Sequence, residues 1–219
     1  GDSTEDIRMP IEFRSSTQTA SFYSPLEEFD RVEVDVEVRE DPVTGRRTRI
    51  VPENFLLPEE EPGIEEFVSD AEGCFFCPEL VDEATPKYRG MIGADRGSKG
   101  EATSFPNLHP YGGYSNVVVL TDAHFVPIDG FTTDVLTDGI GLAVEYISSV
   151  MDGDAEMSVA SVNMNYLRPA GSSIVHPHLQ TLVDRVGTND QSRLYRGIKA
   201  YRDESNESYW EAVLDAKET

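Results

Sequence analysis

The 219-residue chain carries 41 acidic and 18 basic residues, a net charge of −23 at pH 7, and its length suits one domain of moderate size. So acidic a surface repels nucleic acid and anionic membranes, which excludes both as expected partners. No apolar run approaches the roughly 20 residues of a membrane-spanning helix, and residues 1–9 do not resemble a signal peptide, so we expect a cytoplasmic protein.

The first part of the chain predicts an arm followed by a pair of strands. We expect residues 1–30 to form a polar N-terminal arm and residues 31–219 to form a single domain. Within that domain, residues 31–39 alternate valine with charged residues, which is typical of a strand with one buried face. A turn at 41–45 leads into a returning strand at 47–51.

The rest of the chain combines further strands with one long helix. A short helix near 64–68 is expected in an acidic loop, and the chain then stays glycine-rich and irregular up to about residue 104. Apolar residues at helical spacing predict a helix that begins at 132–134 and ends near Met151. Strands are expected at 116–121, 157–166 and 178–186, and two short C-terminal helices at 189–203 and 206–217. Antiparallel strands with one inserted main helix indicate an α+β fold.

The basic residues are unusual in kind, with only four Lys against 14 Arg. Few lysines and many carboxylates, in a chain patterned to fold, favour adaptation to high salt. Molar salt cuts the Debye length to about 3 Å, so the self-repulsion of such a surface is weak there. The alternative, an acidic protein from an ordinary cell, stays open.

The strongest chemical signal is the sequence His176-Pro-His178-Leu-Gln180. On a strand, alternate side chains share a face, so these three polar groups point the same way if the strand is extended there. Three polar groups on one face of an otherwise apolar strand make a poor core layer and indicate a site. The alternative is a pair of solvent-facing histidines on an edge strand.

Two further features lie elsewhere in the sequence. The turn Gly171-Ser172-Ser173 offers backbone N–H groups and hydroxyls, which are the donors that a phosphate needs. Cys74 and Cys77 form a Cys-x-x-Cys, which is compatible with a metal knuckle, a redox pair or two buried thiols.

In this order, the residues resemble the galactose-1-phosphate uridylyltransferase branch of the histidine-triad (HIT) superfamily. The family's pattern has an Asn, then a Gly-Cys-Ser turn, then His-Pro-His-Gly-Gln. The matching segments, within roughly residues 35–185, are the Asp-Pro-x-Thr-Gly strand pair at 41–52, the Cys-x-x-Cys at 74–77, the Asn loop and following strand at 105–124, Asn165, the turn at 171–173 and the histidine strand at 176–180.

The resemblance implies an HIT-like antiparallel sheet and a two-step nucleotidyl transfer. His178 would attack the α-phosphorus of a nucleotide sugar and form a covalent nucleotidyl-histidine, from which a sugar 1-phosphate takes the nucleotide, UMP in this family of galactose metabolism. Gln180 would donate to a phosphoryl oxygen, and the His176 carbonyl would fix the tautomer of His178. The nucleotide- and phosphate-binding residues would be Asn107, Asn165, Gly171, Ser172 and Ser173.

The resemblance also implies a zinc site. Its ligands would be Cys74, Cys77, His124 and His176, a closed set of two thiolates and two imidazoles that suits structural zinc. The metal would tie the cysteine knuckle to the strand that bears His178. A redox pair remains the alternative for the cysteines, although no thioredoxin-like pattern surrounds them.

Departures from the family pattern keep other functions open. Leu179 replaces the glycine that the family usually has, a choice seen in related nucleotide phosphorylases. Asn54 and Leu57 stand where the family has two arginines. The chain also stops about 40 residues after the histidine strand, where the family carries a second half. The alternatives are a HIT-type nucleotide hydrolase or phosphorylase and a non-catalytic, zinc-stabilised nucleotide-binding module. Family members often pair, so a homodimer is expected.

Overall fold

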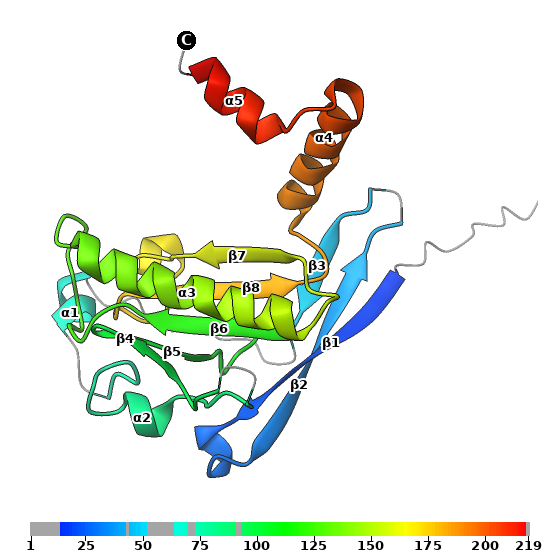
Figure 1. The fold of residues 1–219 in the computed structure, drawn as a ribbon. Helices are drawn as coiled ribbons and strands as arrows, with labels where there is room; N and C mark the ends of the chain where they lie inside the picture. The colour runs from blue at the N-terminus through cyan, green and yellow to red at the C-terminus, as the bar shows by residue number, and fades with distance from the viewer. Residues whose placement is uncertain (1–13, 43, 52–63, 70–72, 91–92, 218–219) are drawn as a thin grey trace, which may run out of the picture. The chain divides into compact units, whose positions relative to one another are not determined.

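The structure is a computed structural model that describes residues 14–42, 44–51, 64–69, 73–90 and 93–217. By its contacts the chain divides into two compact units, residues 1–184 and 185–219, and each is described by itself. The first unit holds two antiparallel sheets and the long helix, and the second holds two helices (Figure 1).

The N-terminal sheet has three antiparallel strands in the order β1-β2-β3, formed by β1 (Arg14–Tyr23), β2 (Arg31–Glu40) and β3 (Arg47–Ile50). The strands predicted at 31–39 and 47–51 are confirmed. The interpretation of residues 14–23 as part of a polar arm is corrected, because β1 pairs with β2 over its whole length and buries Ala20 and Phe22. Its Ser- and Thr-rich sequence hides the alternation. Residues 1–13 lie outside the described residues.

The second sheet has five strands in the order β4-β5-β6-β8-β7, and every neighbouring pair is antiparallel. Its members are β4 (Gly97–Lys99), β5 (Ala102–Pro106), β6 (Tyr114–Val119), β7 (Val159–Asn163) and β8 (His178–Asp184). The strands predicted in the second half of the chain are confirmed, with ends that differ by a few residues. β4 and β5 fall in the stretch that was expected to be irregular.

Helix α3 (Thr133–Gly153) begins where its cap predicts, since the Thr132 hydroxyl accepts from the Val135 N–H. It lies across one face of the five-stranded sheet (Figure 1). Leu142 and Ala143 of the helix are buried there in one apolar cluster. The sheet contributes Val118 from β6, Leu120 just after β6, and Leu179 from β8. This packing leaves the opposite face of the same strands for the site described below.

Short helices complete the first unit: α1 (Ile64–Ser69), which confirms the predicted helix near 64–68, α2 (Val81–Ala84) and the 3₁₀ turns η1 (Pro25–Glu27) and η2 (Arg168–Ala170). The second unit consists of α4 (Asn189–Ser205) and α5 (Tyr209–Lys217), as predicted. The α+β fold with antiparallel sheets, one main helix and short C-terminal helices is therefore confirmed. Within the described residues, no helix is both long and apolar enough to span a bilayer.

Candidate active site and metal centre

The two residues expected to act on phosphorus lie on the sheet face that α3 leaves uncovered. His178 pairs with Val119, and Gln180 pairs with Val117. These two valines cluster with Phe105 and Phe76 rather than with α3. His178 is only 7% exposed, and its ring meets the edge of Phe76 at a centroid distance of 5.2 Å. Gln180 is half-buried on the same face, as the period of the strand predicts.

Hydrogen bonding fixes the tautomer of His178. Its Nδ1 lies 2.8 Å from the backbone carbonyl oxygen of His176. A carbonyl only accepts, so Nδ1 carries the proton and Nε2 keeps its lone pair. Burial lowers the pKa of His178, more than the bond to the carbonyl raises it, so the imidazole is neutral at pH 7. A neutral imidazole with a bare nitrogen can act as a nucleophile.

The four predicted metal ligands meet at one point. The ligand atoms of Cys74, Cys77, His124 and His176 all lie within 4.8 Å of one another. The Cys77 sulfur is 3.5 Å from Nδ1 of His124 and 3.6 Å from Nδ1 of His176, which is also 3.8 Å from the Cys74 sulfur. Tetrahedral zinc with bonds of about 2.3 Å to sulfur and about 2.0 Å to nitrogen would place sulfur and nitrogen about 3.6 Å apart, so the set fits that ion.

The chemistry of this cluster also suits a cation. His176 is fully buried, and its Nε2 lies 2.6 Å from the Thr121 carbonyl oxygen, so Nε2 is protonated and Nδ1 faces the sulfurs with its lone pair. Burial and the neighbouring Cys74 raise the pKa of the Cys77 thiol to about 11. Two thiols so placed gain from a bound cation that replaces their protons.

The glycine–serine turn is built around Gly171, whose φ of +87° favours glycine. The Gly171 and Ser172 N–H groups donate to the carbonyls of Arg168 and Leu167, and the Ser172 hydroxyl donates to the Ile174 carbonyl. These donors are thus engaged within the turn, and the part that both residues play in phosphate binding stays a prediction. Ser173, Gly171 and Asn165 are all exposed. Asn165 lies beside the turn, because its amide nitrogen would be 3.9 Å from a Cβ atom added at Gly171.

Two asparagines differ in what they can offer. Asn107 is 8% exposed, and its Oδ1 accepts from the His109 N–H at 2.9 Å, which leaves its amide NH₂ to donate. Asn163, which the sequence analysis did not single out, pairs with Gln180 across β7 and β8 and is exposed. The period of two on β7 would have found it once the bounds of the strand were known.

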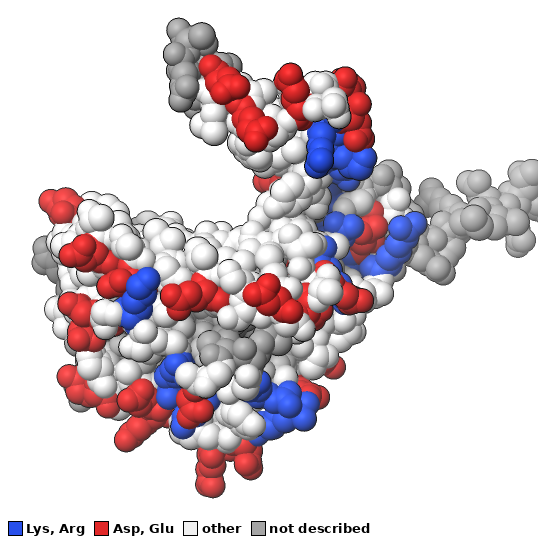
Figure 2. All heavy atoms as spheres, viewed as in Figure 1, with Lys and Arg blue, Asp and Glu red and all other residues white. Residues whose placement is uncertain are grey.

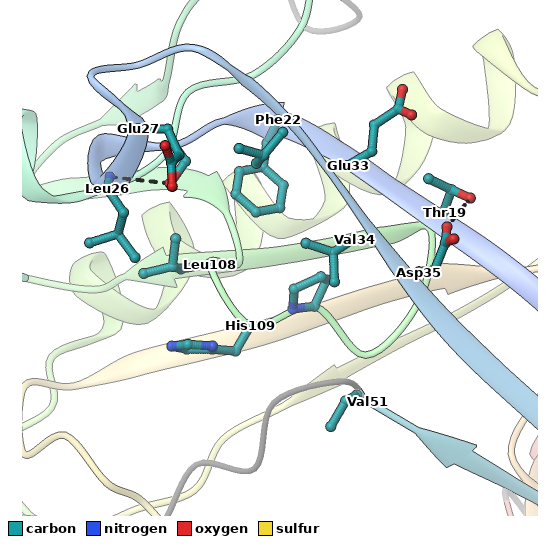
Figure 3. Close-up of a pocket in the computed structure, with 13 residues that line it drawn as sticks. Thr19, Phe22, Leu26, Glu27, Glu33, Val34, Asp35, Val51, Leu108 and His109 are labelled. Atoms are coloured by element: carbon teal, nitrogen blue, oxygen red, sulfur yellow. Dashed lines mark hydrogen bonds between the residues drawn. The ribbon is translucent and has the colours of Figure 1, made fainter.

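His109 lines a separate pocket of about 690 Å³ between the β1–β2 strands and the loop after β5 (Figure 3). Phe22, Val34 and Leu108 form apolar walls there, as the close-up shows. None of the predicted catalytic, nucleotide-binding or metal-binding residues lines this pocket.

Comparison with known proteins found no matching family model. The chain is 30% identical over 207 residues to an uncharacterized protein of Archaeoglobus fulgidus, covering 94% of this chain and 61% of that protein. Among solved structures it is similar to an ADP-glucose phosphorylase from Arabidopsis thaliana with bound ADP-glucose, at 21% identity and a TM-score of 0.47, covering 78% of this chain and 56% of that one. It is also similar to a uridylyltransferase, at 16% identity and a TM-score of 0.49, covering 81% of this chain and 55% of that one.

The chain thus spans a little over half the length of these proteins. A GalT-like protein from Arabidopsis thaliana is also similar, at 20% identity and a TM-score of 0.47, covering 62% of this chain and 48% of that one.

Proposed function

We propose that the chain belongs to the galactose-1-phosphate uridylyltransferase branch of the HIT superfamily. In this proposal it transfers a nucleoside monophosphate, UMP by resemblance, from a nucleotide sugar to a sugar 1-phosphate. The observation that supports the transfer best is His178, a neutral imidazole with its proton held on Nδ1 by the His176 carbonyl. Its nucleophilic nitrogen stays separate from the cluster that would bind a metal.

The reaction then has two balanced steps through one intermediate. Nε2 of His178 attacks the α-phosphorus, an N–P bond forms, and the P–O bond to the departing sugar 1-phosphate breaks. A phosphate oxygen of the acceptor next attacks the same phosphorus, the N–P bond breaks, and the imidazole is restored. Gln180, on the same face of β8, donates to the phosphoryl oxygen as charge builds in both steps. Asn107, Asn165, Gly171, Ser172 and Ser173 are proposed to hold the nucleotide and its phosphates.

Cys74, Cys77, His124 and His176 are proposed to hold zinc. When bound, the ion would serve structure rather than chemistry, since four protein ligands leave no open position. The cluster joins the knuckle at 74–77 to the segments that follow β6 and precede β8, so it supports the backbone that carries His178. Two imidazoles beside the thiols favour a metal over a redox pair.

The substitution that suggested a phosphorylase or hydrolase has a packing explanation. Leu179 is 6% exposed and lies in the core beneath α3, on the opposite face of β8 from His178. A larger side chain there fills the core and leaves the catalytic face unchanged. Leu179 therefore favours neither phosphate nor water over a sugar 1-phosphate as the acceptor.

Intact mass spectrometry after incubation with a panel of nucleotide sugars tests the proposal. We expect a gain of one nucleotide, mapped to the peptide that contains His178. The gain should vanish in His178→Gln and persist in His109→Gln, a matched change of an exposed histidine outside the site. The adduct is then treated with each acceptor in turn. A nucleotide sugar formed with a sugar 1-phosphate supports transfer. A nucleoside diphosphate formed with phosphate identifies a phosphorylase, and a nucleoside monophosphate formed with water identifies a hydrolase. No adduct with any donor would leave only a binding module.

A further inference from the structure

We propose that Glu101 positions the two histidines of the metal centre, acting through Thr121. The inference rests on the metal centre of the proposed function, but Glu101 is none of its ligands. It would supply no bond to the ion. Instead it fixes the backbone at 121–123, whose Thr121 carbonyl holds the ring of His176 and which leads directly into His124.

The position of Glu101 is set by a tight hairpin. Lys99 pairs with Ala102, so Gly100 and Glu101 form the two-residue turn between β4 and β5. Gly100 has a φ of +55°, and a Cβ there would come 2.3 Å from a carboxylate oxygen of Asp138 on α3, so the turn packs closely against the helix. The register that pairs Thr103 with Val119, continued by two residues, places Glu101 beside Thr121.

Glu101 holds the turn that follows β6. Its Oε2 accepts from the Thr121 hydroxyl at 2.5 Å and from the Asp122 N–H at 3.2 Å. The Thr121 Oγ1 in turn accepts from the Ala123 N–H at 3.3 Å. These two bonds to the carboxylate lower the pKa of Glu101, which is therefore ionised at neutral pH and accepts both. One carboxylate oxygen thus organises the backbone over 121–123.

The same turn orients both histidine ligands. The Thr121 carbonyl accepts from Nε2 of the fully buried His176 at 2.6 Å and so fixes the tautomer and direction of that ring. The Leu120 N–H donates to the Pro177 carbonyl, which keeps the two segments side by side. His124 follows directly after the turn, with Nδ1 3.5 Å from the Cys77 sulfur. Partners of this kind, beyond the ligands themselves, commonly tune metal affinity.

Two measurements on the full chain test this role. The first is zinc affinity, determined by competition with a chromophoric chelator, and the second is the absorption spectrum of the cobalt-loaded protein. Glu101→Ala should lower zinc affinity about 10-fold or more and alter the cobalt spectrum. Glu101→Gln still accepts both hydrogen bonds and should stay close to the native protein. Asp122→Asn is the matched control, because it removes a negative charge within the same turn and keeps the backbone N–H that donates to Glu101.

Thr121 provides an independent pair of variants in case Glu101→Ala does not fold. Thr121→Val should lose affinity, and Thr121→Ser, which keeps the hydroxyl, should retain it. Adding Glu101→Ala to Thr121→Val should cause a smaller loss than Glu101→Ala causes in the native chain, because both changes remove the bond between Thr121 and Glu101. The inference is overturned if Glu101→Ala or Thr121→Val binds zinc as tightly as the native protein, or if Asp122→Asn loses as much as Glu101→Ala. A native chain that binds no zinc overturns the metal centre itself, and the His178 adduct is measured separately from both.

Discussion

Tyr88 and Asn116 form a buried polar pair beneath α3. The Tyr88 hydroxyl donates to Oδ1 of Asn116, which is completely buried in β6, and Tyr88 stacks on Tyr146 of the helix. Tyr88→Phe would leave that oxygen without its donor, so we expect a loss of about 1–3 kcal/mol in the free energy of unfolding, measured with denaturant. Tyr195→Phe, at a half-exposed position, should change little. Equal effects would contradict the pairing.

Single residues were predictable where a strand's period or a motif's spacing determines their place. His178, Gln180 and the carbonyl that orients the imidazole follow from a period of two along one strand. Glu101 does not, because it owes its place beside Thr121 to the register of β5 against β6. The engaged amides of the 171–173 turn are likewise a matter of local backbone geometry, which residue types do not specify.

At the scale of elements, the proposed metal centre would join the cysteine knuckle to the ends of two strands. Cys74→Ser or a chelator should lower the melting temperature of the zinc-loaded protein much more than His178→Ala does, because the first removes a link between segments distant in sequence. His178→Ala should abolish the nucleotide adduct and keep zinc affinity. Differential scanning calorimetry measures the contrast. Equal losses of stability would contradict the separation of structural and chemical roles.

A second link joins the two sheets. Asp184, at the end of β8, is 4% exposed, pairs with Arg49 of β3 and accepts from the Gln18 amide of β1 at 2.8 Å. Asp184→Ala would leave the largely buried Arg49 guanidinium without this carboxylate, so we expect a loss of about 3 kcal/mol in unfolding free energy. Asp203→Ala breaks the exposed pair with Lys199 and should cost little. A change at Asp184 that costs as little would show that the sheets need no such link.

The elements that the sequence predicted are those with a long or pure pattern. Helix α3 has a polar cap and apolar residues at helical spacing along its 21 residues, and β2 alternates without a break. β4 has only three residues, and β5, with the sequence ATSFP, does not alternate apolar with polar residues. β1 places serine and threonine where a strand often has larger apolar residues. Pairing with neighbours decides such segments, and pairing is a long-range property.

At the scale of the whole molecule, the large negative net charge is the feature that should make stability depend on salt. Figure 2 shows carboxylates spread along α3 and over the neighbouring surface, with fewer cationic groups among them. With a net charge of −23, self-repulsion at low salt acts over a Debye length of about 10 Å at 0.1 M and shrinks to about 3 Å at 1 M. Folding compresses these charges, so the folded state gains more from screening than the unfolded chain does.

We therefore expect the melting temperature to rise from low to molar potassium chloride. Chloride is the proper anion for the test, because sulfate would strengthen apolar burial whatever the charge. A variant with Glu145→Gln and Asp152→Asn, two exposed carboxylates of α3, should be more stable than the native chain at low salt and equal to it at molar salt. A native melting temperature that stays constant across this range would remove the interpretation of the acidic surface as an adaptation to high salt, and the excess of carboxylates would then need a different cause.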